Sequence, residues 1–411
     1  MTDERPKLRA VESQWVEHQG RPYVSIRDPL GLAKQGLLVP QPLAPLLNLC
    51  DGTRDVLALT TALALTAGVQ LSPSQIRDFV QAMDAALLLD NGSFRKASVA
   101  ALKEYRKAPH RRPALAGRAY PADPNALADA LDDYCTRALS ANGALPGSAD
   151  LRGIVCPHID YERGNGTYAQ LWQRCAPALE DVELAILLGT DHSGGPGALT
   201  LTRQDYATPF GVLPTDRKIV DGLADVLGEE DAFAEELHHV EEHSIELATV
   251  WFHRSIGGRD CPIVPVLCGS FYGFTNCASD PAEDGRLNAA VDYLRTAMAG
   301  RKTLVIAAGD LAHVGPNFGD PAPLDAAGRA TLAKEDAASI AAIREGDAAG
   351  FFELSLAEGD RRRICGLPPI YMMLRLLDPM QGESMGYAQC PADANGGSLV
   401  SIVGALLYEE E

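Results

Sequence analysis

The feature that most constrains this chain is an alternation of short apolar runs with amphipathic stretches from about residue 113 onward. Four apolar runs have the length of buried strands: 151–156, 184–189, 262–268 and 303–308. Stretches with a helical spacing of apolar residues accompany them, at 167–179, 218–227, 245–255 and 287–299. This alternation predicts an α/β fold with a mainly parallel central sheet flanked by helices. Further strands are expected near the end of the chain, at 387–389 and 398–407.

The charge distribution separates this α/β part from the residues before it. The chain of 411 residues has a net charge of −19, and its length is typical of two or three domains. Residues 1–112 hold 15 Lys and Arg against 11 Asp and Glu, and the remaining 299 residues hold 21 against 44. We therefore expect a small domain over 1–94, a basic linker over 95–112 and an acidic α/β domain over 113–411.

The first 94 residues have the pattern of a small α+β domain. Apolar residues recur at helical spacing over 43–50, 56–67 and 72–87. Asp51 or Thr53 is placed to cap the second of these helices. A strand is expected at 21–26, and the leucines before Asp-Asn-Gly at 90–92 are typical of a strand entering a tight hairpin. Three short helices and a hairpin predict a winged-helix domain.

Composition also limits the partners and the compartment. Phosphate binding requires clustered Lys and Arg, so the acidic balance argues against nucleic acid as a main partner. The segment 95–112 carries seven basic residues and one acidic residue, and it is either a solvated linker or a strip that docks on the acidic domain or on a partner. With no apolar signal core and no apolar run near the roughly 18–20 residues of a membrane span, we expect a cytoplasmic protein without a membrane partner.

Three of the predicted strands are followed by polar segments that contain histidine. His158 follows the first strand run, His192 follows the second, and Asp310 and His313 follow the fourth. Parallel strands end at one edge of the sheet, where α/β proteins bind their ligands. One such histidine alone is more simply a structural residue, but three at equivalent positions indicate a metal centre or an acid–base site. The spacing of Asp310 and His313 lets the carboxylate orient the imidazole.

Cys365 is the cysteine that we single out among the nine. Without a CxxC pair, and in a reducing compartment, cysteines are expected to be buried thiols, as Cys156 and Cys268 inside apolar runs should be. Cys365 instead comes shortly after three arginines and precedes a Gly-Leu-Pro-Pro turn into a helix. A helix N-terminus and nearby cations lower a thiol pKa, so this residue is either a small core residue or a thiolate that serves as ligand or nucleophile.

Four other polar residues near these segments are also considered. Asp160 is a metal ligand, a partner of His158 or one half of a surface salt bridge. His243 is a structural residue at a helix N-terminus or a pocket residue, and the structural role is favoured. His238 and His239 are expected to form an exposed helical pair, because adjacent residues on a helix point in different directions.

The second part of the chain resembles the Memo family, whose prokaryotic members are known as AmmeMemoRadiSam system protein B. The matching segments cover nearly all of 113–411 in the family's order: 116–124, 157–164, 188–192, 207–211, 242–246, 309–313 and 364–366. The resemblance implies a fold related to class III extradiol dioxygenases and a metal-binding crevice. Carried over to this sequence, it implies metal ligands at His158, His192 and Cys365, with Asp310 and His313 lining the same pocket.

The resemblance also implies the kind of metal. The related dioxygenases hold non-haem iron with two histidines and a glutamate. Here a cysteine takes the place of that carboxylate, and a soft thiolate also suits Cu or Zn. One transition-metal ion is therefore implied, with Fe(II) as the first expectation and Cu or Zn as alternatives.

The first 94 residues are similar to PqqD-like peptide-recognition domains. The likeness is carried by Leu-Cys-Asp-Gly-Thr at 49–53, a following helix, Leu71-Ser72, and Asp-Ala-Ala-Leu-Leu-Leu-Asp at 84–90. It implies that this domain recruits a peptide or a protein, and the family's system name suggests a radical SAM enzyme as partner. A DNA-binding winged helix has the same pattern, but the modest charge gives it little support.

Three functions compete. The first is a metal-dependent redox enzyme, with iron or copper, that acts on a peptide, a protein or a small aromatic substrate, with His313 as acid or base and Asp310 orienting it. The second is a protein that binds a metal or a peptide without turnover. The third is a hydrolase or acyl transferase in which Cys365 is the nucleophile and His313 the base.

Overall fold

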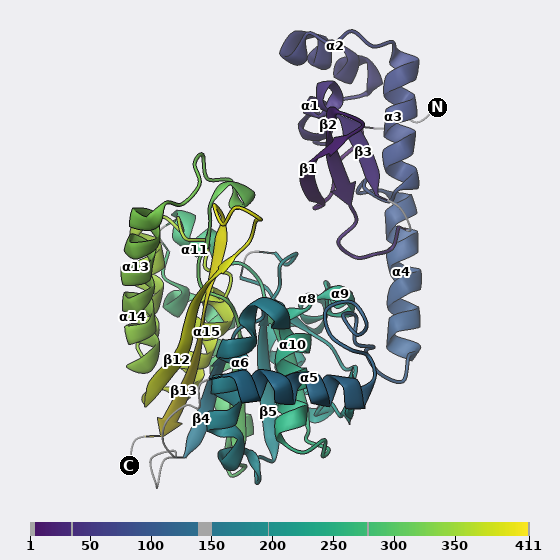
Figure 1. Ribbon diagram of the computed structural model, residues 1–411. Helices are drawn as coiled ribbons and strands as arrows, with labels where there is room; N and C mark the ends of the chain where they lie inside the picture. The colour runs from purple at the N-terminus through teal and green to yellow at the C-terminus, as the bar shows by residue number, and fades with distance from the viewer. Residues whose placement is uncertain (1–4, 34–35, 139–149, 196, 278, 410–411) are drawn as a thin grey trace. The chain divides into compact units, whose positions relative to one another are not determined.

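The structure is a computed structural model that describes residues 5–33, 36–138, 150–195, 197–277 and 279–409. It divides into two compact units, Met1–Ala108 (unit 1) and Pro109–Glu411 (unit 2), coloured from purple to yellow in Figure 1. The boundary falls inside the basic segment 95–112. No helix in the described ranges has both the length and the apolar character that a membrane crossing requires.

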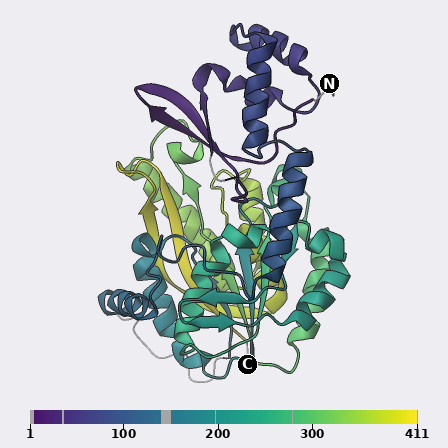
Figure 2. The same cartoon turned by 90° about the vertical axis from the view of Figure 1, so that its right-hand side faces the viewer.

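Unit 1 packs a three-stranded antiparallel sheet against short helices. The strands are β1 (Glu12–His18), β2 (Arg21–Arg27) and β3 (Leu37–Pro40), in that order across the sheet, and Figure 2 shows the β1–β2 hairpin in purple. The helices are α1 (Pro45–Leu49), α2 (Val56–Ala67), α3 (Pro73–Ala85) and α4 (Gly92–Lys107). One apolar core of strand and helix residues, including Ile26, Leu59 and Met83, joins sheet to helices.

Two predictions for unit 1 were wrong. No hairpin follows residue 89, because the Asn91 side chain accepts hydrogen bonds from the backbone N–H groups of Ser93 and Phe94 and so caps α4. The basic segment is therefore helical up to Lys107, and the wing expected of a winged helix is absent from the described part of unit 1. Helix α2 is capped by neither Asp51 nor Thr53 but by Asp55, which directly precedes it.

Unit 2 is built on an eight-stranded sheet. The order is β11-β13-β4-β10-β5-β9-β6, with β12 paired to β13; the strands β4, β10, β5 and β9 in its middle are parallel. Their bounds are β4 (Leu151–Cys156), β5 (Leu184–Thr190), β6 (Leu199–Leu201), β9 (Ile263–Cys268), β10 (Thr303–Ala308), β11 (His313–Val314), β12 (Met380–Pro391) and β13 (Leu399–Glu409). A separate hairpin joins β7 (Tyr206–Thr208) and β8 (Gly211–Leu213). The predicted mixed α/β fold with a mainly parallel central sheet is confirmed.

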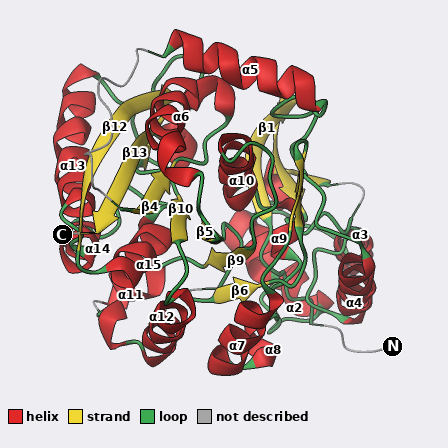
Figure 3. Ribbon diagram, turned by 90° about the horizontal axis from the view of Figure 1, so that it is seen from below, coloured by secondary structure: helices red, strands yellow, loops and turns green. Residues whose placement is uncertain are grey.

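Helices cover both faces of this sheet (Figure 3). They are α5 (Pro124–Arg137), α6 (Tyr161–Cys175), α7 (Arg217–Leu227), α8 (Glu229–Ala232), α9 (His238–Glu241), α10 (Ser244–Ser255), α11 (Tyr272–Cys277), α12 (Gly285–Met298), α13 (Ala326–Arg344), α14 (Ala348–Ala357) and α15 (Leu367–Leu377). Helices α6 and α10 pack on one face, and α15 and α7 pack on the other.

The burial of the central strands explains why their sequences are continuous apolar runs. Every residue of β5, β9 and β10 is buried, as expected for parallel strands covered on both faces. Neighbouring residues of a strand point to opposite faces, so Ile154 joins the core under α6 and α10 whereas Val155 joins the core under α7 and α15. Two apolar cores therefore hold the carboxyl ends of these strands in place.

Candidate metal centre

The carboxyl ends of three adjacent strands carry the polar residues that the sequence singled out. β4 leads to His158, β10 leads to Asp310, and β5 leads to His192. Because β10 lies between β4 and β5, the three segments meet at one edge of the sheet. The fold thus brings these residues together, as expected from the strand pattern.

Three imidazole rings lie face to edge or stacked at this edge. The ring centroids of His158 and His192 are 5.0 Å apart, those of His158 and His243 are 5.1 Å apart, and those of His192 and His243 are 4.8 Å apart. One nitrogen from each ring lies within 4.8 Å of the others. His243 precedes α10 and makes no side-chain cap there, so the favoured structural interpretation of this residue was wrong.

A second set of donor atoms overlaps the first at His158. The Cys365 Sγ lies 3.2 Å from the His158 Nε2, and the Asp310 Oδ2 lies 3.9 Å from the same nitrogen. His158, Asp310 and Cys365 again place one donor atom each within 4.8 Å of one another. His158 is therefore the shared member, and the thiolate, the carboxylate and the other imidazoles surround it.

Glycines let the segment carrying Cys365 pass close to the end of β10. A Cβ on Gly309 would lie 2.3 Å from the Gly366 Cα, and a Cβ on Gly366 would lie 2.7 Å from the Asp310 carbonyl oxygen. The Gly366 N–H donates to that carbonyl at 2.9 Å, and the Thr190 hydroxyl donates to the Cys365 carbonyl at 2.8 Å. Hydrogen bonds at the ends of β10 and β5 thus fix the backbone that carries the sulfur.

The Cys365 thiol is set up to be ionised. Burial opposes its charge, but the positive charges of His158 and His313 and hydrogen bonds from His158 and His192 outweigh burial and lower the pKa to about 5. Cys365 immediately precedes Gly366, the N-cap of α15, as predicted. The arginines, which were expected to lower this pKa, are not among its main causes; Arg361, Arg362 and Arg363 form ion pairs with carboxylates.

The histidines divide into charged and neutral members. Burial opposes protonation of His158, but the Cys365 and Asp310 charges outweigh it and raise its pKa to about 9. Burial also opposes protonation of His192, but interactions with Glu242 and Cys365 outweigh burial and hold its pKa well above the usual value. Burial dominates for His243 and lowers its pKa to about 3. At neutral pH the metal-free site is thus a thiolate among imidazolium groups, with His243 neutral.

Glu242 is the site residue whose role the sequence reasoning missed. Its Oε2 accepts from the His192 Nδ1 at 3.0 Å and from the His192 N–H at 3.1 Å. Its Oε1 accepts from the backbone N–H groups of His243 and Ser244 at 2.8 and 3.0 Å. This buried carboxylate therefore orients His192 and the segment that carries His243. The sequence signals were an acidic residue next to a histidine before an apolar helix, and the place of Glu242 in the segment 242–246 that resembles the Memo family.

The two residues proposed for acid–base roles lie differently from the expectation. The Asp310 Oδ1 accepts from the backbone N–H groups of His158 and Ile159 at 2.8 and 3.3 Å, so the carboxylate supports His158 rather than orienting His313. His313 begins β11, and its Nδ1 lies 3.2 Å from the Leu311 carbonyl oxygen. Its charge contributes to the lowered pKa of Cys365, but it does not join either set of donor atoms.

The remaining sequence predictions have mixed outcomes. Asp160 caps α6 and pairs with Arg163 at 2.5 Å, which is the salt-bridge interpretation. The prediction of an exposed histidine pair was wrong: His239 is fully buried and lies within hydrogen-bond distance of the Tyr206 hydroxyl, and the His238 Nδ1 contacts the Asp191 carboxylate at 2.9 Å. Cys156 and Cys268 are core residues, as predicted.

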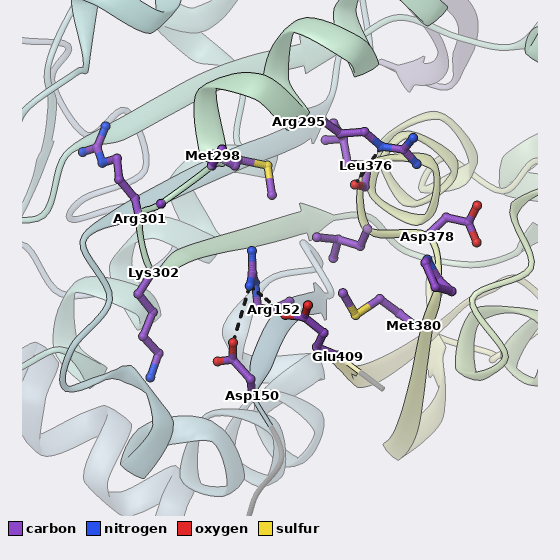
Figure 4. Close-up of a pocket in the computed structure, with 14 residues that line it drawn as sticks. Asp150, Arg152, Arg295, Met298, Arg301, Lys302, Leu376, Asp378, Met380 and Glu409 are labelled. Atoms are coloured by element: carbon purple, nitrogen blue, oxygen red, sulfur yellow. Dashed lines mark hydrogen bonds and ion pairs between the residues drawn. The ribbon is translucent and has the colours of Figure 1, made fainter. Parts of the chain in front are cut away.

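A larger hollow at the opposite end of the sheet is a poorer place for chemistry. It has a volume of about 680 Å³ and lies at the start of β4 and β10 (Figure 4). Its four cationic side chains already have partners: Arg152 pairs with Asp150 and Glu409, Arg295 donates to the Leu376 carbonyl, and Arg301 and Lys302 pair with Asp216 and Asp181. The hollow beside Cys365 and His192 is smaller, at about 180 Å³, and it adjoins the donor atoms.

The donor set fits a transition-metal ion. It combines a thiolate of low pKa, three imidazoles within 4.8 Å of one another and a buried carboxylate. Imidazole suits Zn, Cu and Fe, and thiolate selects for soft ions such as Cu(I) or Zn. The histidine–carboxylate contact at Glu242 is the kind of support that holds ligating histidines in place.

Comparison with known proteins decides the family. A family model described as Memo-like protein matches residues 111–405. The chain belongs to the Memo family. A MEMO1 family protein from Aquifex aeolicus is 26% identical over 410 residues, which cover 98% of this chain and all of that relative. One from Methanopyrus kandleri is 29% identical over 288 residues, or 68% of this chain and 91% of the relative. The Memo match contains every residue of the candidate metal centre, and the similarity to the Aquifex aeolicus protein extends over unit 1.

Proposed function

We propose that unit 2 is a metal-dependent redox enzyme whose ion is held by His158, His192 and Cys365. The observation that carries the proposal is the 3.2 Å contact between the Cys365 Sγ and the His158 Nε2, made inside a cluster of imidazoles at the carboxyl edge of the sheet. Membership of the Memo family supports it. Fe(II) is the ion we expect first, and Cu or Zn are the alternatives.

The residues around the ligands have separate tasks in this proposal. A bound iron or copper ion would supply one-electron redox chemistry to a substrate or to oxygen. Asp310 fixes the backbone at His158 and Glu242 orients the His192 ring, through the hydrogen bonds described above. With its Nδ1 directed at a backbone carbonyl, His313 would exchange a proton through its Nε2, which makes it the acid–base residue we propose.

Metal analysis of the anaerobically purified chain tests the proposal. After reconstitution with Fe(II), Cu(I) or Zn(II), we expect about one ion per chain in the wild type and its loss in His158→Ala, His192→Ala and Cys365→Ala. His18→Ala and Cys277→Ala change an exposed histidine and an exposed cysteine and should keep the ion. A wild type that takes up no ion contradicts the proposal, and uptake without oxygen consumption on any candidate substrate favours a binding protein instead.

A second function has one observation in its favour. A thiolate with a pKa of about 5 that contacts an imidazolium is also the arrangement of a cysteine nucleophile. In that case Cys365 would form an acyl intermediate as a hydrolase or acyl transferase, and a chelator would leave the activity unchanged. Loss of activity on chelation, with recovery on adding the metal, rejects this alternative.

We also propose that unit 1 recruits a peptide or protein, and that a radical SAM enzyme is a partner. The residue pattern at 49–53 and 84–90 supports this proposal, together with the small sheet, whose edge strands are β1 and β3. Copurification of the full chain with a candidate radical SAM enzyme tests it, and binding of DNA in place of a peptide or protein would contradict it.

A further inference from the structure

The cavity beside the metal centre has a lining that restricts what it can accept. It has a volume of about 180 Å³, and Cys365 and His192 form part of its wall. It is therefore the space next to the proposed metal ligands, and the inference drawn from it rests on the proposed function. What the cavity accepts depends on the remainder of its wall.

Most of that remainder is apolar or aromatic. Ile364 precedes α15, and Leu367 and Pro368 are its first residues. Phe271 precedes α11, and Tyr272 is its first residue. Phe271 is buried, whereas Tyr272 is 59% exposed and so lies where the cavity meets solvent. Aromatic side chains favour stacking with another ring and also attract cations to their faces.

Three of the charged groups in the wall are already balanced. The Asp191 carboxylate contacts the His238 Nδ1 at 2.9 Å, the His192 imidazole contacts the Glu242 carboxylate at 3.0 Å, and the Cys365 sulfur contacts His158 as described. The described residues that line the cavity include no lysine and no arginine. A carboxylate or phosphate group of a ligand would therefore meet no free cation there.

Asp360 is the exception to this balance. Its carboxylate lines the cavity and has neither a hydrogen bond nor an ion pair within the described ranges. Burial and the charge of Glu358 raise its pKa and outweigh the charge of Arg363, which lowers it. The neighbouring Arg363 is occupied with the Asp320 carboxylate at 2.7 Å and the His313 carbonyl oxygen at 3.1 Å. A half-buried carboxylate without a hydrogen bond or ion pair is a site for a cationic group.

We propose that the cavity binds a small molecule with an aromatic body and a protonated amine, with the ring against Phe271 and Tyr272 and the ammonium group on Asp360. The ring then lies beside His192 and Cys365, next to the proposed metal ligands. Asp360 is in this account a specificity residue for the amine. Molecules of the same shape that carry a carboxylate are excluded.

Calorimetry on the full chain without metal tests this proposal with three probes of similar size. Phenethylamine, 2-phenylethanol and 3-phenylpropionate share the ring and differ in the charge of the end group. We expect phenethylamine to bind at least about tenfold more tightly than 2-phenylethanol, and 3-phenylpropionate to bind most weakly. Equal affinity for the amine and the carboxylate would overturn the proposal.

A matched pair of variants tests whether the preference for the amine depends on Asp360. Asp360→Asn removes the charge and suits the backbone, because φ is +55° there and asparagine tolerates this region well. It should abolish the preference for the amine, whereas Glu353→Gln removes an equivalent charge from an exposed position on α14 and should leave the preference intact. Retention of the preference in Asp360→Asn would refute the role of this carboxylate.

Two further comparisons test whether the aromatic ring is needed and whether the ligand proposal fails independently of the proposed function. N-acetyl-lysinamide presents an ammonium group on an alkyl chain, and binding as tight as that of phenethylamine would overturn the aromatic part of the proposal. Metal uptake without any preference for the amine would overturn the ligand proposal and leave the proposed function standing. Preference for the amine in a chain that takes up no metal would overturn only the proposed function.

Discussion

Glu242→Gln is expected to weaken metal binding by about 10- to 100-fold. In the wild type one carboxylate oxygen faces two donors of His192, and the other faces the N–H groups of His243 and Ser244. An amide offers only one acceptor oxygen, so its NH₂ group must face one of these pairs of donors. If the NH₂ group faces His192, a charge-assisted hydrogen bond worth about 1.5–3 kcal/mol is lost, and about 1.4 kcal/mol corresponds to tenfold in affinity.

The assay is a competition titration of the metal-free chain against a chelator of known affinity, with Zn(II) as the ion. Glu241→Gln is the matched control, because Glu241 is the preceding residue, its side chain is 48% exposed and its ion pair with Arg118 is long, at 3.6 Å. We expect Glu241→Gln to bind as the wild type does. Equal affinities for the two variants would refute the reasoning that Glu242 holds His192 for the metal.

Three more predictions follow from the geometry. Zn(II) affinity should rise at least about tenfold per pH unit between pH 5 and 9, because the ion must displace the proton of His158, whose pKa is raised to about 9. An affinity that does not change with pH in this range would contradict a protonated His158 in the metal-free chain. Gly366→Ala should weaken Zn(II) binding, since its Cβ would lie 2.7 Å from the Asp310 carbonyl, whereas Gly285→Ala, with nothing within 4 Å, should not; chelator competition measures both. Asp336→Ala leaves Arg362, which is 2% exposed, without its partner at 2.8 Å. The free energy of unfolding measured in urea should fall by about 3 kcal/mol, the lower end of the range of about 3–5 kcal/mol for a broken buried pair, because Glu358 still pairs with Arg362. A loss below about 1 kcal/mol would mean that this pair contributes no more than a surface ion pair.

The sequence was most informative where both faces of an element are buried. The strands at 151–156 and 303–308 were predicted at their observed bounds. In an α/β chain, a short apolar run of that length usually forms a strand that is buried on both faces. His158, His192 and Asp310 follow such strands directly. Their convergence therefore depends on strand order alone, which the parallel sheet fixes.

The pattern of apolar residues did not place His243 and Glu242 at the site, because another kind of contact positions them. Both precede α10, which reaches the edge of the sheet only because Gly189 in β5 has no side chain: a Cβ there would lie 2.5 Å from the Ile245 Cγ1. The Ser244 hydroxyl then donates to the Thr190 carbonyl at 2.8 Å. Packing between residues distant in sequence has no periodic signature, so the pattern of apolar residues could not reveal it.

The error in unit 1 has a local cause. Asp-Asn-Gly at 90–92 is a common hairpin turn, but asparagine is also among the best helix N-caps. The residues after Asn91 include alanine, lysine and arginine, which favour helix. The capping interpretation therefore prevails, and α4 replaces the expected strand.

X-ray absorption spectroscopy of the Zn(II)-loaded chain tests the central claim most directly. We expect one sulfur at about 2.3 Å and nitrogen or oxygen ligands at about 2.0–2.1 Å in the wild type. The sulfur should disappear in Cys365→Ala and persist in Cys277→Ala, which removes an exposed cysteine. A wild-type spectrum without sulfur, or a sulfur that persists in Cys365→Ala, would contradict a metal centre built on His158, His192 and Cys365.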